Sequence, residues 1–384
     1  MNAQGRALGR TRRVMTGSTG FVGSHFALRS WQANNPPITL TRASSDAAAE
    51  ARVLDALGAA QRSLGQASLP ELAAPFALPA DLTQPGCGLT PEQLLRLRRA
   101  QPEQFWHFAA SLRYEDKHRT EIFAHNLEGT ARALELAHAS GCHTFVYVST
   151  AYTAGRRQGA IEERLHDLSA GFNNAYEESK ARAEQAVADY CARAGLRFAI
   201  LRPSIVIGPY ATKSTGGSRT GLYGFLREVG RVGRALRALG RPVEFRGDGG
   251  TTCNLIPVDW FIDDILALLD EGLQNGGVYH NTLSRPPTID QVGQVVARAL
   301  DLPGFVIDPR STLRSALEER FLRRTAFYGS YLWNDKSFQR QRPAARELSL
   351  TDLEDYVRGF LRETALATPD SAAANMSRVA SRPA

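Results

Sequence analysis

The chain has 384 residues, of which 43% are hydrophobic, and a formal net charge of +7. This length accommodates one large domain with an appended lobe, and no stretch approaches the roughly 18 apolar residues of a membrane-spanning helix. The basic first residues have no apolar run behind them, which argues against a secretory signal, and the arginines are spread along the chain without a nucleic-acid-binding motif.

The predicted elements of the first two thirds alternate between short apolar runs and amphipathic stretches. Strands are predicted at residues 13–16, 37–41, 76–80, 105–109, 144–148 and 198–206. Helices are predicted from about Phe21, in the alanine-rich stretch after residue 41, and at residues 91–99, 121–139 and 176–194. Strands and helices that alternate in this way form βα units around a parallel sheet.

After Pro209 the pattern changes. A Ser/Thr/Gly-rich loop (211–221) precedes an arginine-studded helix that ends near residue 239, and further helices are predicted at 258–273 and 288–302 around a strand at 278–283. Residues 311–348 mix aromatics and arginines without a clear period. We expect an α/β fold with a Rossmann-type doubly wound parallel sheet and a smaller C-terminal α/β substrate lobe. The expected segments are a basic disordered leader (1–12), a Rossmann NADP-binding and catalytic core (13–209), a mixed segment that completes the core and forms the substrate lobe (210–366), and a disordered tail (367–384).

The four cysteines are scattered and have no CxxC or CxxH spacing. Such spacing argues against both a zinc site and a disulfide framework, so we expect no metal and a protein of the reducing cytoplasm. The cysteines are Cys87, Cys142, Cys191 and Cys253.

A glycine-rich loop lies between the first strand and the first helix, with the sequence Gly17-Ser18-Thr19-Gly20-Phe21-Val22-Gly23. In a dinucleotide site the first glycine permits the tight turn, the second lets the backbone approach the pyrophosphate, and the third lets helix and strand pack closely. The phosphates would lie at the helix N-terminus, where N–H groups and the helix dipole favour anions. The loop therefore predicts a nucleotide site, with a purely structural turn as the alternative.

The end of the second strand bears on the choice of cofactor. An NAD site usually has an acidic residue there for the ribose 2′-hydroxyl, whereas this chain has Arg42 and no acid until Asp46. A guanidinium suits a 2′-phosphate. Arg42 therefore favours NADPH, with a solvated arginine at a strand end as the alternative.

A tyrosine and a lysine, Tyr176 and Lys180, lie four residues apart on one face of a predicted helix. A free phenol titrates near pH 10, and a nearby ammonium is expected to lower that pKa so that the phenol exchanges a proton with a carbonyl oxygen. Strand 144–148 ends in Ser149 and Thr150, whose hydroxyls could bind a developing oxyanion. The alternatives are a surface Tyr–Lys pair and local capping of the strand end.

Taken in order over residues 14–208, these motifs resemble the extended short-chain dehydrogenase/reductases. The resemblance rests on the glycine loop, His107-Phe108-Ala109-Ala110, Asn126-x2-Gly129-Thr130, Ser149-Thr150, Tyr176-x3-Lys180 and Leu201-Arg202-Pro203-Ser204. It implies that Thr150, Tyr176 and Lys180 form the catalytic triad, and that Lys180 also holds the nicotinamide ribose. The implied cofactor-binding set is Gly17, Ser18, Thr19, Gly20, Phe21, Val22, Gly23, Arg42, Asp81, Leu82, Ala109, Ala110, Ser111, Asn126, Ser149, Tyr176, Lys180, Pro203 and Ile205.

Several local phrases resemble the thioester reductases within this group, including fatty acyl-CoA reductases of the male-sterility type. They are Asp81-Leu82-Thr83, Gly88-Leu89-Thr90, Ala110 to Tyr114, Ser149 to Tyr152, Arg202 to Gly208 and Asn254 to Asp259. Sugar-nucleotide enzymes usually carry Arg-Asp-Phe where this chain has Cys253-Asn254-Leu255, which counts against a nucleotide sugar. The resemblance thus implies NADPH-dependent reduction of an acyl thioester to an aldehyde, and leaves a second reduction to the alcohol open.

The acyl group is expected to arrive on CoA or on an acyl carrier protein, because the chain contains no adenylation or carrier domain of its own. Four arginines could contact the phosphates of that carrier, although a solvated helix face is favoured for them. Several aromatics after Pro209 are expected in the core rather than along an acyl channel. A homodimer is left open. The arginines are Arg219, Arg227, Arg231 and Arg234, and the aromatics are Tyr223, Phe225, Phe327, Tyr328, Tyr331 and Trp333.

Two alternatives stand beside the thioester reductase. The first is an extended short-chain enzyme of another kind, either an alcohol or sterol-type dehydrogenase or a sugar-nucleotide epimerase or dehydratase. The second is a non-catalytic NADP-binding sensor that keeps the glycine loop, against which the intact pair of Tyr176 and Lys180 counts.

Overall fold

The computed structural model describes residues 11–67, 75–312 and 315–364 of the chain. The predicted tail and nearly all of the predicted leader lie outside these residues. Among the helices of the described residues, none is both long and apolar enough to cross a membrane.

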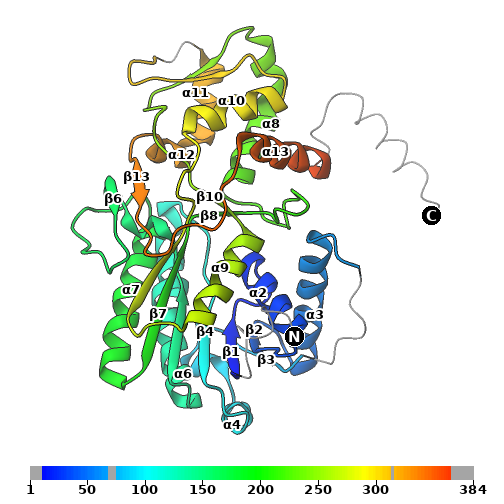
Figure 1. Cartoon of the computed structure of the whole chain (residues 1–384), viewed down its shortest axis with the longest axis vertical. Coiled ribbons are helices and arrows are strands. Elements are labelled where there is room, and N and C mark those ends of the chain that lie inside the picture. Colours follow the sequence, from blue (N-terminus) through cyan, green and yellow to red (C-terminus); the bar gives the residue numbers. More distant parts are fainter. Residues whose placement is uncertain (1–10, 68–74, 313–314, 365–384) are drawn as a thin grey trace, which may run out of the picture.

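A parallel sheet of seven strands forms the centre of the molecule (Figure 1). Its order is β11-β7-β5-β4-β1-β2-β3, so the chain builds outward from β1 in one direction and then returns to add β4 and later strands on the other side. This is the Rossmann-type arrangement that was predicted. Ligands bind at the carboxyl ends of the strands where the order reverses, here between β1 and β4. The strands are β1 (Arg13–Thr16), β2 (Ile38–Thr41), β3 (Ala77–Pro79), β4 (Gln104–His107), β5 (Thr144–Val148), β7 (Arg197–Pro203) and β11 (Gly277–Asn281).

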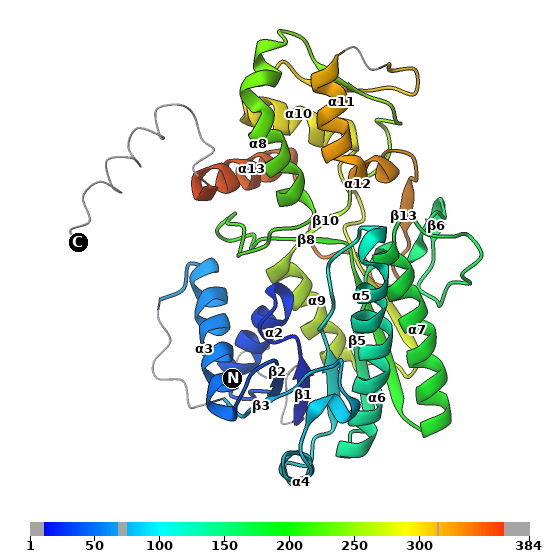
Figure 2. The same cartoon turned by 180° about the vertical axis from the view of Figure 1, so that it is seen from behind.

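Helices cover both faces of the sheet (Figures 1 and 2). Successive strand residues point to opposite faces, so Met15 packs into one core with Phe26 of α2, and Val14 packs into the other core with Leu134 of α6. Each face therefore has its own apolar core. The helices of the first face are α2 (Phe21–Gln32), α3 (Asp46–Ser63) and α9 (Val258–Glu271); those of the second are α4 (Pro91–Arg99), α6 (Gly129–Ser140) and α7 (Ala175–Ala194).

The predicted helix at 121–139 is interrupted in the structure. It consists of α5 (Arg119–Phe123), a π-helical turn at Ala124–Glu128, and α6. The turn contains Asn126, whose carbonyl accepts a hydrogen bond from the Thr130 hydroxyl at 2.6 Å and whose amide is bound to Ser111 and Ser179. The hydrogen bonds to Ser111 and Ser179 lie at the point where the α-helix changes to a π-helical turn. The spacing of apolar residues does not indicate this change.

The predicted strand at 198–206 is also divided. It separates at Ser204 into β7, which lies in the main sheet, and β8 (Ile205–Ile207), which pairs with β10 (Leu255–Pro257) instead. The Ser204 N–H donates to the Asn281 carbonyl at 3.1 Å, and from there the chain leaves the main sheet. The apolar run continues across the break because both halves are packed against neighbours.

The C-terminal lobe lies at one end of the sheet (Figure 1). The described residues of the stretch 311–348, which has no clear period in the sequence, form two helices, a 3-10 turn and a strand. The lobe contains α8 (Leu222–Ala238), α10 (Ile289–Ala299), α11 (Ala316–Arg324), α12 (Ala326–Gly329) and α13 (Leu350–Thr364), with the parallel strand pairs β9 (Val243–Phe245) with β12 (Phe305–Ile307) and β6 (Gly159–Ile161) with β13 (Lys336–Phe338). Short 3-10 turns lie at Pro85–Gly88, Asp116–His118, Ala151–Ala154 and Ser330–Leu332.

Candidate active site

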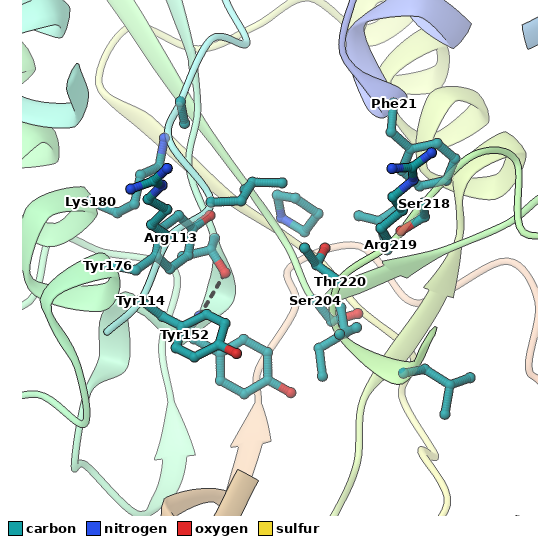
Figure 3. Close-up of a pocket in the computed structure, with 18 of the residues that line it drawn as sticks. Phe21, Arg113, Tyr114, Tyr152, Tyr176, Lys180, Ser204, Ser218, Arg219 and Thr220 are labelled. Atoms are coloured by element: carbon teal, nitrogen blue, oxygen red, sulfur yellow. Dashed lines mark hydrogen bonds between the residues drawn. The ribbon is translucent and has the colours of Figure 1, made fainter. Parts of the chain in front are cut away.

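A cavity of about 1380 Å³ lies between the carboxyl ends of the sheet strands and the C-terminal lobe. Sites for one small ligand usually measure about 300–1,000 Å³, so this cavity has room for two molecules side by side. One part follows the glycine loop and the ends of β1 to β4, and the other enters the lobe. Figure 3 shows its two walls, with Tyr176 and Lys180 on one side and Phe21, Ser218 and Arg219 on the other.

The glycine loop follows β1 directly and leads into α2. A Cβ on Gly17 would lie 2.6 Å from the Ala109 nitrogen, and one on Gly23 would lie 2.1 Å from the Gly17 carbonyl oxygen. Both positions therefore require glycine. The N-cap residue of α2, Gly20, offers no side-chain cap, and the first turn carries no acid, so this helix end is open to an anion.

Two arginines line the cavity beside the end of β2: Arg42, directly after that strand, and Arg52, in the second turn of α3. Both side chains are exposed and line the cavity. Asp81 follows β3, and its hydrogen bonds from the N–H and hydroxyl of Thr83, together with the charge of Arg42, hold the pKa of its carboxyl below the usual value. No sequence motif marks Arg52, although it lies only ten residues after Arg42 on an exposed helix face.

The segment after β4 passes along the cavity with Ala109, Ala110 and Ser111 on its wall. Asn126 fixes this segment from behind. Its side-chain oxygen accepts from the Ser111 N–H at 2.7 Å, and its amide nitrogen donates to the Ser111 carbonyl at 3.1 Å and the Ser179 hydroxyl at 3.0 Å. Asn126 is buried and does not line the cavity, so it positions the wall rather than forming it.

Lys180 lies one turn after Tyr176 on α7, facing the end of β5 (Figure 3). Its ammonium donates to the Val148 carbonyl at 2.8 Å and lies 4.1 Å from the centre of the Tyr147 ring. Burial lowers the pKa of Lys180 to about 7, although the charge of Glu184 opposes the shift. The ammonium is thus rigidly held and titrates close to neutral pH.

The pKa of the Tyr176 phenol is raised above its ordinary value, first by burial and then by the negative charge of Glu177. The sequence-based expectation that Lys180 lowers this pKa is therefore wrong for the protein without cofactor, because removal from water outweighs the charge four residues away. A neutral phenol in this position is a proton donor.

Thr150 follows β5 and faces the same space. Its Oγ1 accepts the Tyr152 N–H at 3.3 Å, which leaves the hydroxyl proton available to another acceptor (Figure 3). Ser149 and Ser204 are also lining residues of the cavity, and their hydroxyl oxygens are buried without a hydrogen-bond partner among the described residues. Buried hydroxyls without partners indicate groups that a ligand completes, so the glycine cradle and these serines fit a bound dinucleotide.

Nearly all the residues that the sequence implies for the site line this one cavity. Ser18 and Asn126 do not, and the Ser18 side chain is buried behind the loop. Those that do are Gly17, Thr19, Gly20, Phe21, Val22, Gly23, Arg42, Asp81, Leu82, Ala109, Ala110, Ser111, Ser149, Thr150, Tyr176, Lys180, Pro203 and Ile205.

The part of the cavity inside the lobe is mainly apolar. Phe225, Tyr328 and Tyr331 line it, contrary to the expectation that the lobe aromatics lie in the core. Tyr223 is a core residue, with its hydroxyl bound to the Gly208 N–H at 3.0 Å, whereas Trp333 is 43% exposed. The side chain of Phe327 lies outside the described part of the structure. Further apolar lining residues are Phe245, Val292, Phe305, Ile307, Leu322 and Leu332.

Of the four arginines considered for the carrier phosphates, Arg219 lines the cavity, next to Phe21 and Ser218 (Figure 3). Arg231 and Arg234 are exposed on α8 and do not line it, as a solvated helix face implies. The Arg227 guanidinium donates to the Arg219 carbonyl at 3.2 Å and so steadies the turn that carries Arg219.

A family model described as male sterility protein, for an NAD-binding domain, matches residues 15–265. The chain belongs to the male sterility protein family. It is an oxidoreductase of the extended short-chain dehydrogenase/reductase type that uses a nicotinamide dinucleotide. The match covers the glycine loop and helix α7 with its Tyr176–Lys180 pair.

Curated relatives match this male sterility family member over limited stretches. An isonitrile lipopeptide synthase of Streptomyces coeruleorubidus is 30% identical over 211 residues, which are 54% of this chain and 14% of the synthase. A UDP-glucose 4-epimerase of Rhizobium leguminosarum bv. trifolii is 32% identical over 108 residues, 28% of this chain and 32% of the epimerase. The chain thus spans less than a third of the length of either relative.

Solved structures share the fold of this family member along nearly its whole length. The terminal R domain of the myxalamid PKS-NRPS pathway superposes with a TM-score of 0.74 at 19% identity, covering 94% of this chain and 93% of that domain. The dTDP-glucose 4,6-dehydratase DesIV of Streptomyces venezuelae gives a TM-score of 0.60 at 19% identity, covering 94% and 100%. Such identities establish a common fold.

Proposed function

We propose that this protein is an NADPH-dependent reductase of acyl thioesters. The observation that carries the proposal is the apolar part of the cavity, which continues from Tyr176 into the lobe between Phe225, Val292 and Phe305. An aliphatic acyl group gains free energy from burial against such walls, whereas a nucleotide sugar requires hydrogen-bonding and phosphate-binding groups there. Cys253 lines this wall where sugar-nucleotide enzymes usually carry an arginine.

The site residues support the following reaction. NADPH, when bound, would supply the hydride that adds to the thioester carbonyl carbon. The C=O electron pair moves to oxygen, and the hydroxyls of Thr150 and Tyr176 stabilise the negative charge that develops. Tyr176 then gives its proton to that oxygen and forms a hemithioacetal. When the C–S bond of the hemithioacetal breaks, the Tyr176 phenolate takes the hydroxyl proton back and the aldehyde forms. The sulfur leaves as a thiolate and takes a proton from solvent.

Lys180 compensates the charge on Tyr176 after the proton transfer. Its ammonium is held by the Val148 carbonyl at 2.8 Å and lies on the same face of α7 as the phenol. A phenolate in a buried site is costly without a nearby cation. The ammonium therefore lowers the barrier to proton donation and would also hold the nicotinamide ribose.

The choice of NADPH over NADH rests on Arg42 and Arg52. Two exposed guanidinium groups from neighbouring elements line the end of the cavity where the adenosine ribose would lie. Together they offer charge-assisted hydrogen bonds to a 2′-phosphate.

For the thioester carrier we propose CoA or an acyl carrier protein, whose phosphopantetheine would enter past Arg113 and Arg219 (Figure 3). Two similar proteins support an acyl substrate: one is the terminal R domain of the myxalamid PKS-NRPS biosynthetic pathway, and the other is an isonitrile lipopeptide synthase.

The decisive experiment incubates the protein with NADPH and a series of acyl-CoA thioesters, and follows nicotinamide absorbance and free thiol together. We expect one thiol to be released for each NADPH that reduces a thioester to the aldehyde. The rate of thiol release should be at least about 100-fold lower for Tyr176→Phe. NADPH oxidation without thiol release would reject the thioester as substrate. That outcome, with oxidation on a ketone or aldehyde, would establish the alternative of an alcohol or sterol-type dehydrogenase, which the apolar cavity also suits.

A further inference from the structure

A second buried lysine lies in the substrate part of the cavity. Lys336 begins β13, is only 4% exposed and lines the same cavity as Tyr176. The chain has only four lysines against 42 arginines, and two of the four line this cavity. The family motifs and the proposed reaction assign no role to Lys336.

The ammonium of Lys336 is poorly satisfied. Among the described residues it makes one hydrogen bond, to the Asn334 carbonyl at 3.1 Å, and no carboxylate lies within ion-pair distance. An ammonium has three donors, so two remain without an acceptor. Burial lowers the pKa of this group to about 8, against the opposing charges of Glu177 and Asp335.

The nearby carboxylates are occupied by other donors. Glu177 accepts the Tyr331 hydroxyl at 2.7 Å and the Asn173 N–H at 3.0 Å. Asp335 accepts the N–H and hydroxyl of Thr252 at 2.9 and 2.8 Å. Neither acid is therefore placed to complete the Lys336 ammonium, and a lysine needed only to neutralise Glu177 would lie in contact with it.

The position of Lys336 is fixed by the surrounding structure. β13 is paired with β6, and the Asn334 amide donates to the Asn173 side chain at 3.1 Å and the Ser330 carbonyl at 3.0 Å. A charged donor on such a rigid frame is pre-organised for a ligand, because little side-chain freedom is lost on binding.

Strand β13, which begins with Lys336, lies beside Tyr152, because the rings of Phe338 and Tyr152 meet edge-on with centres 5.8 Å apart. Tyr331, which binds Glu177 next to Tyr176, stacks edge-on against Tyr152 with ring centres 5.3 Å apart. The N–H of Tyr152 in turn binds Thr150. An acyl thioester whose carbonyl meets Thr150 and Tyr176 therefore passes Tyr152, Tyr331 and Lys336. The other walls of this part of the cavity are mostly apolar.

We propose that Lys336 is a specificity-determining residue that binds an acceptor oxygen of the substrate, a carbonyl or carboxylate separate from the reacting thioester. This inference rests on the proposed function. The oxygen has two sources: an amide carbonyl of the pantetheine arm, or an oxygen substituent on the acyl group. Both supply the hydrogen bonds that the ammonium lacks.

The test measures binding of unreactive thioethers to the NADP⁺-loaded protein by calorimetry. Three ligands are compared: an S-alkyl pantetheine, the same compound with a terminal carboxylate on the alkyl chain, and a dialkyl thioether without amides. Lys336→Met removes the ammonium at similar volume, and Lys117→Met changes an exposed lysine outside the cavity as the control. Unchanged affinity for NADP⁺ shows that each variant is folded, and Lys336→Gln replaces the Met variant if that one does not fold.

We expect Lys336→Met to weaken binding about tenfold or more for the ligand that carries the bound oxygen, and Lys117→Met to leave it unchanged. Equal losses for both pantetheine ligands, with none for the dialkyl thioether, identify the pantetheine amide. A loss confined to the carboxylate ligand identifies the acyl group. Equal affinities of wild type and Lys336→Met for all three ligands overturn the inference. Thiol release by the wild type, measured on the same preparation, decides the proposed function separately.

Discussion

At the scale of single residues, helix α7 contains two groups whose pKa values move in opposite directions. Burial raises the pKa of Tyr176 and lowers that of Lys180. Both shifts favour the uncharged form, as expected where burial removes water. The site therefore holds a neutral proton donor beside a cation that is only just retained at neutral pH.

This arrangement predicts the pH dependence of the reaction. The ammonium form of Lys180 is needed, and its pKa is about 7, so kcat/KM for NADPH should be constant below pH 7 and fall about tenfold per unit above it. The arginine of Lys180→Arg keeps its charge at every accessible pH. The kcat/KM of this variant should therefore not fall above pH 7, although it will be lower than that of the wild type at low pH. A wild-type profile that stays flat from pH 6 to about 9 contradicts the assignment.

The two arginines at the adenosine end give a second residue-scale prediction. Arg42→Gln and Arg52→Gln should each weaken NADPH binding about tenfold, because each removes a charge-assisted hydrogen bond to the 2′-phosphate. NADH has no such phosphate, so its affinity should change by less than about twofold. Fluorescence titration with both cofactors measures the ratio. Arg62→Gln is the matched control, because Arg62 lies on α3 like Arg52 but outside the cavity. Equal losses of affinity for NADPH and NADH in the Arg42 and Arg52 variants would remove the basis for NADPH preference.

At the scale of elements, the π-helical turn links a helix to the cavity wall. The buried side chain of Asn126 makes three hydrogen bonds, two of them to the backbone of Ser111. Asn126→Ala should lower the free energy of unfolding by about 2–4 kcal/mol, since it leaves buried groups without partners. It should also weaken NADPH binding, because Ser111 lines the cavity.

Denaturant unfolding and cofactor titration on one preparation check both effects of Asn126→Ala. Asn275→Ala, which removes a single exposed hydrogen bond to the Phe198 N–H, is the control for loss of an asparagine. If Asn126→Ala is no less stable than Asn275→Ala, the π-helical turn does not depend on this side chain.

Local sequence predicts those elements that are defined by local interactions. Helix α4 begins and ends as predicted, because Thr90 and Gln93 form a capping box and Pro91 occupies the first turn. The break at Ser204 and the π-helical turn depend on partners distant in the chain, so the apolar periodicity of the sequence does not predict them. The strands of the lobe have only three residues each, too few to show alternation.

The residues of the candidate site also fall into two groups: those that a local motif predicts and those placed by distant parts of the chain. Residues next to a glycine loop or a Tyr–Lys pair could be named from the sequence, and most of them line the cavity. Arg52, Tyr331 and Lys336 could not, because their place in the cavity depends on how α3 and the lobe pack. Ser18 belongs to the motif but is buried behind it, since successive residues of a tight loop point to different sides.

At the scale of the whole molecule, the last helix reaches the beginning of the first. The loop after Pro209 lies between α13 and α2, where Lys213 pairs with Asp352 at 2.8 Å and the Thr215 hydroxyl donates to Glu363 at 2.6 Å. A Cβ on Gly216 of this loop would lie 2.7 Å from the Phe21 ring at the start of α2. The wall opposite Tyr176 therefore depends on a helix more than 300 residues later in the chain than the glycine loop.

This long-range support predicts the effect of a single methyl group. Gly359 of α13 packs against the loop so closely that a Cβ would lie 2.1 Å from the Lys213 carbonyl oxygen. Gly359→Ala must displace either the helix or the loop, and should lower the free energy of unfolding by about 1–3 kcal/mol. NADPH affinity should fall several-fold with it, because the displaced loop contacts Phe21.

The matched control for Gly359→Ala is Gly233→Ala, also within a helix, where only the far end of the Arg237 side chain lies within 4 Å of the new Cβ. That change should stabilise the protein by about 0.5–1 kcal/mol, as alanine does in a helix interior, and leave cofactor binding unchanged. Thermal unfolding with and without NADPH separates the two variants. If Gly359→Ala matches Gly233→Ala in both measurements, the close packing of α13 on the loop does not support the wall opposite Tyr176.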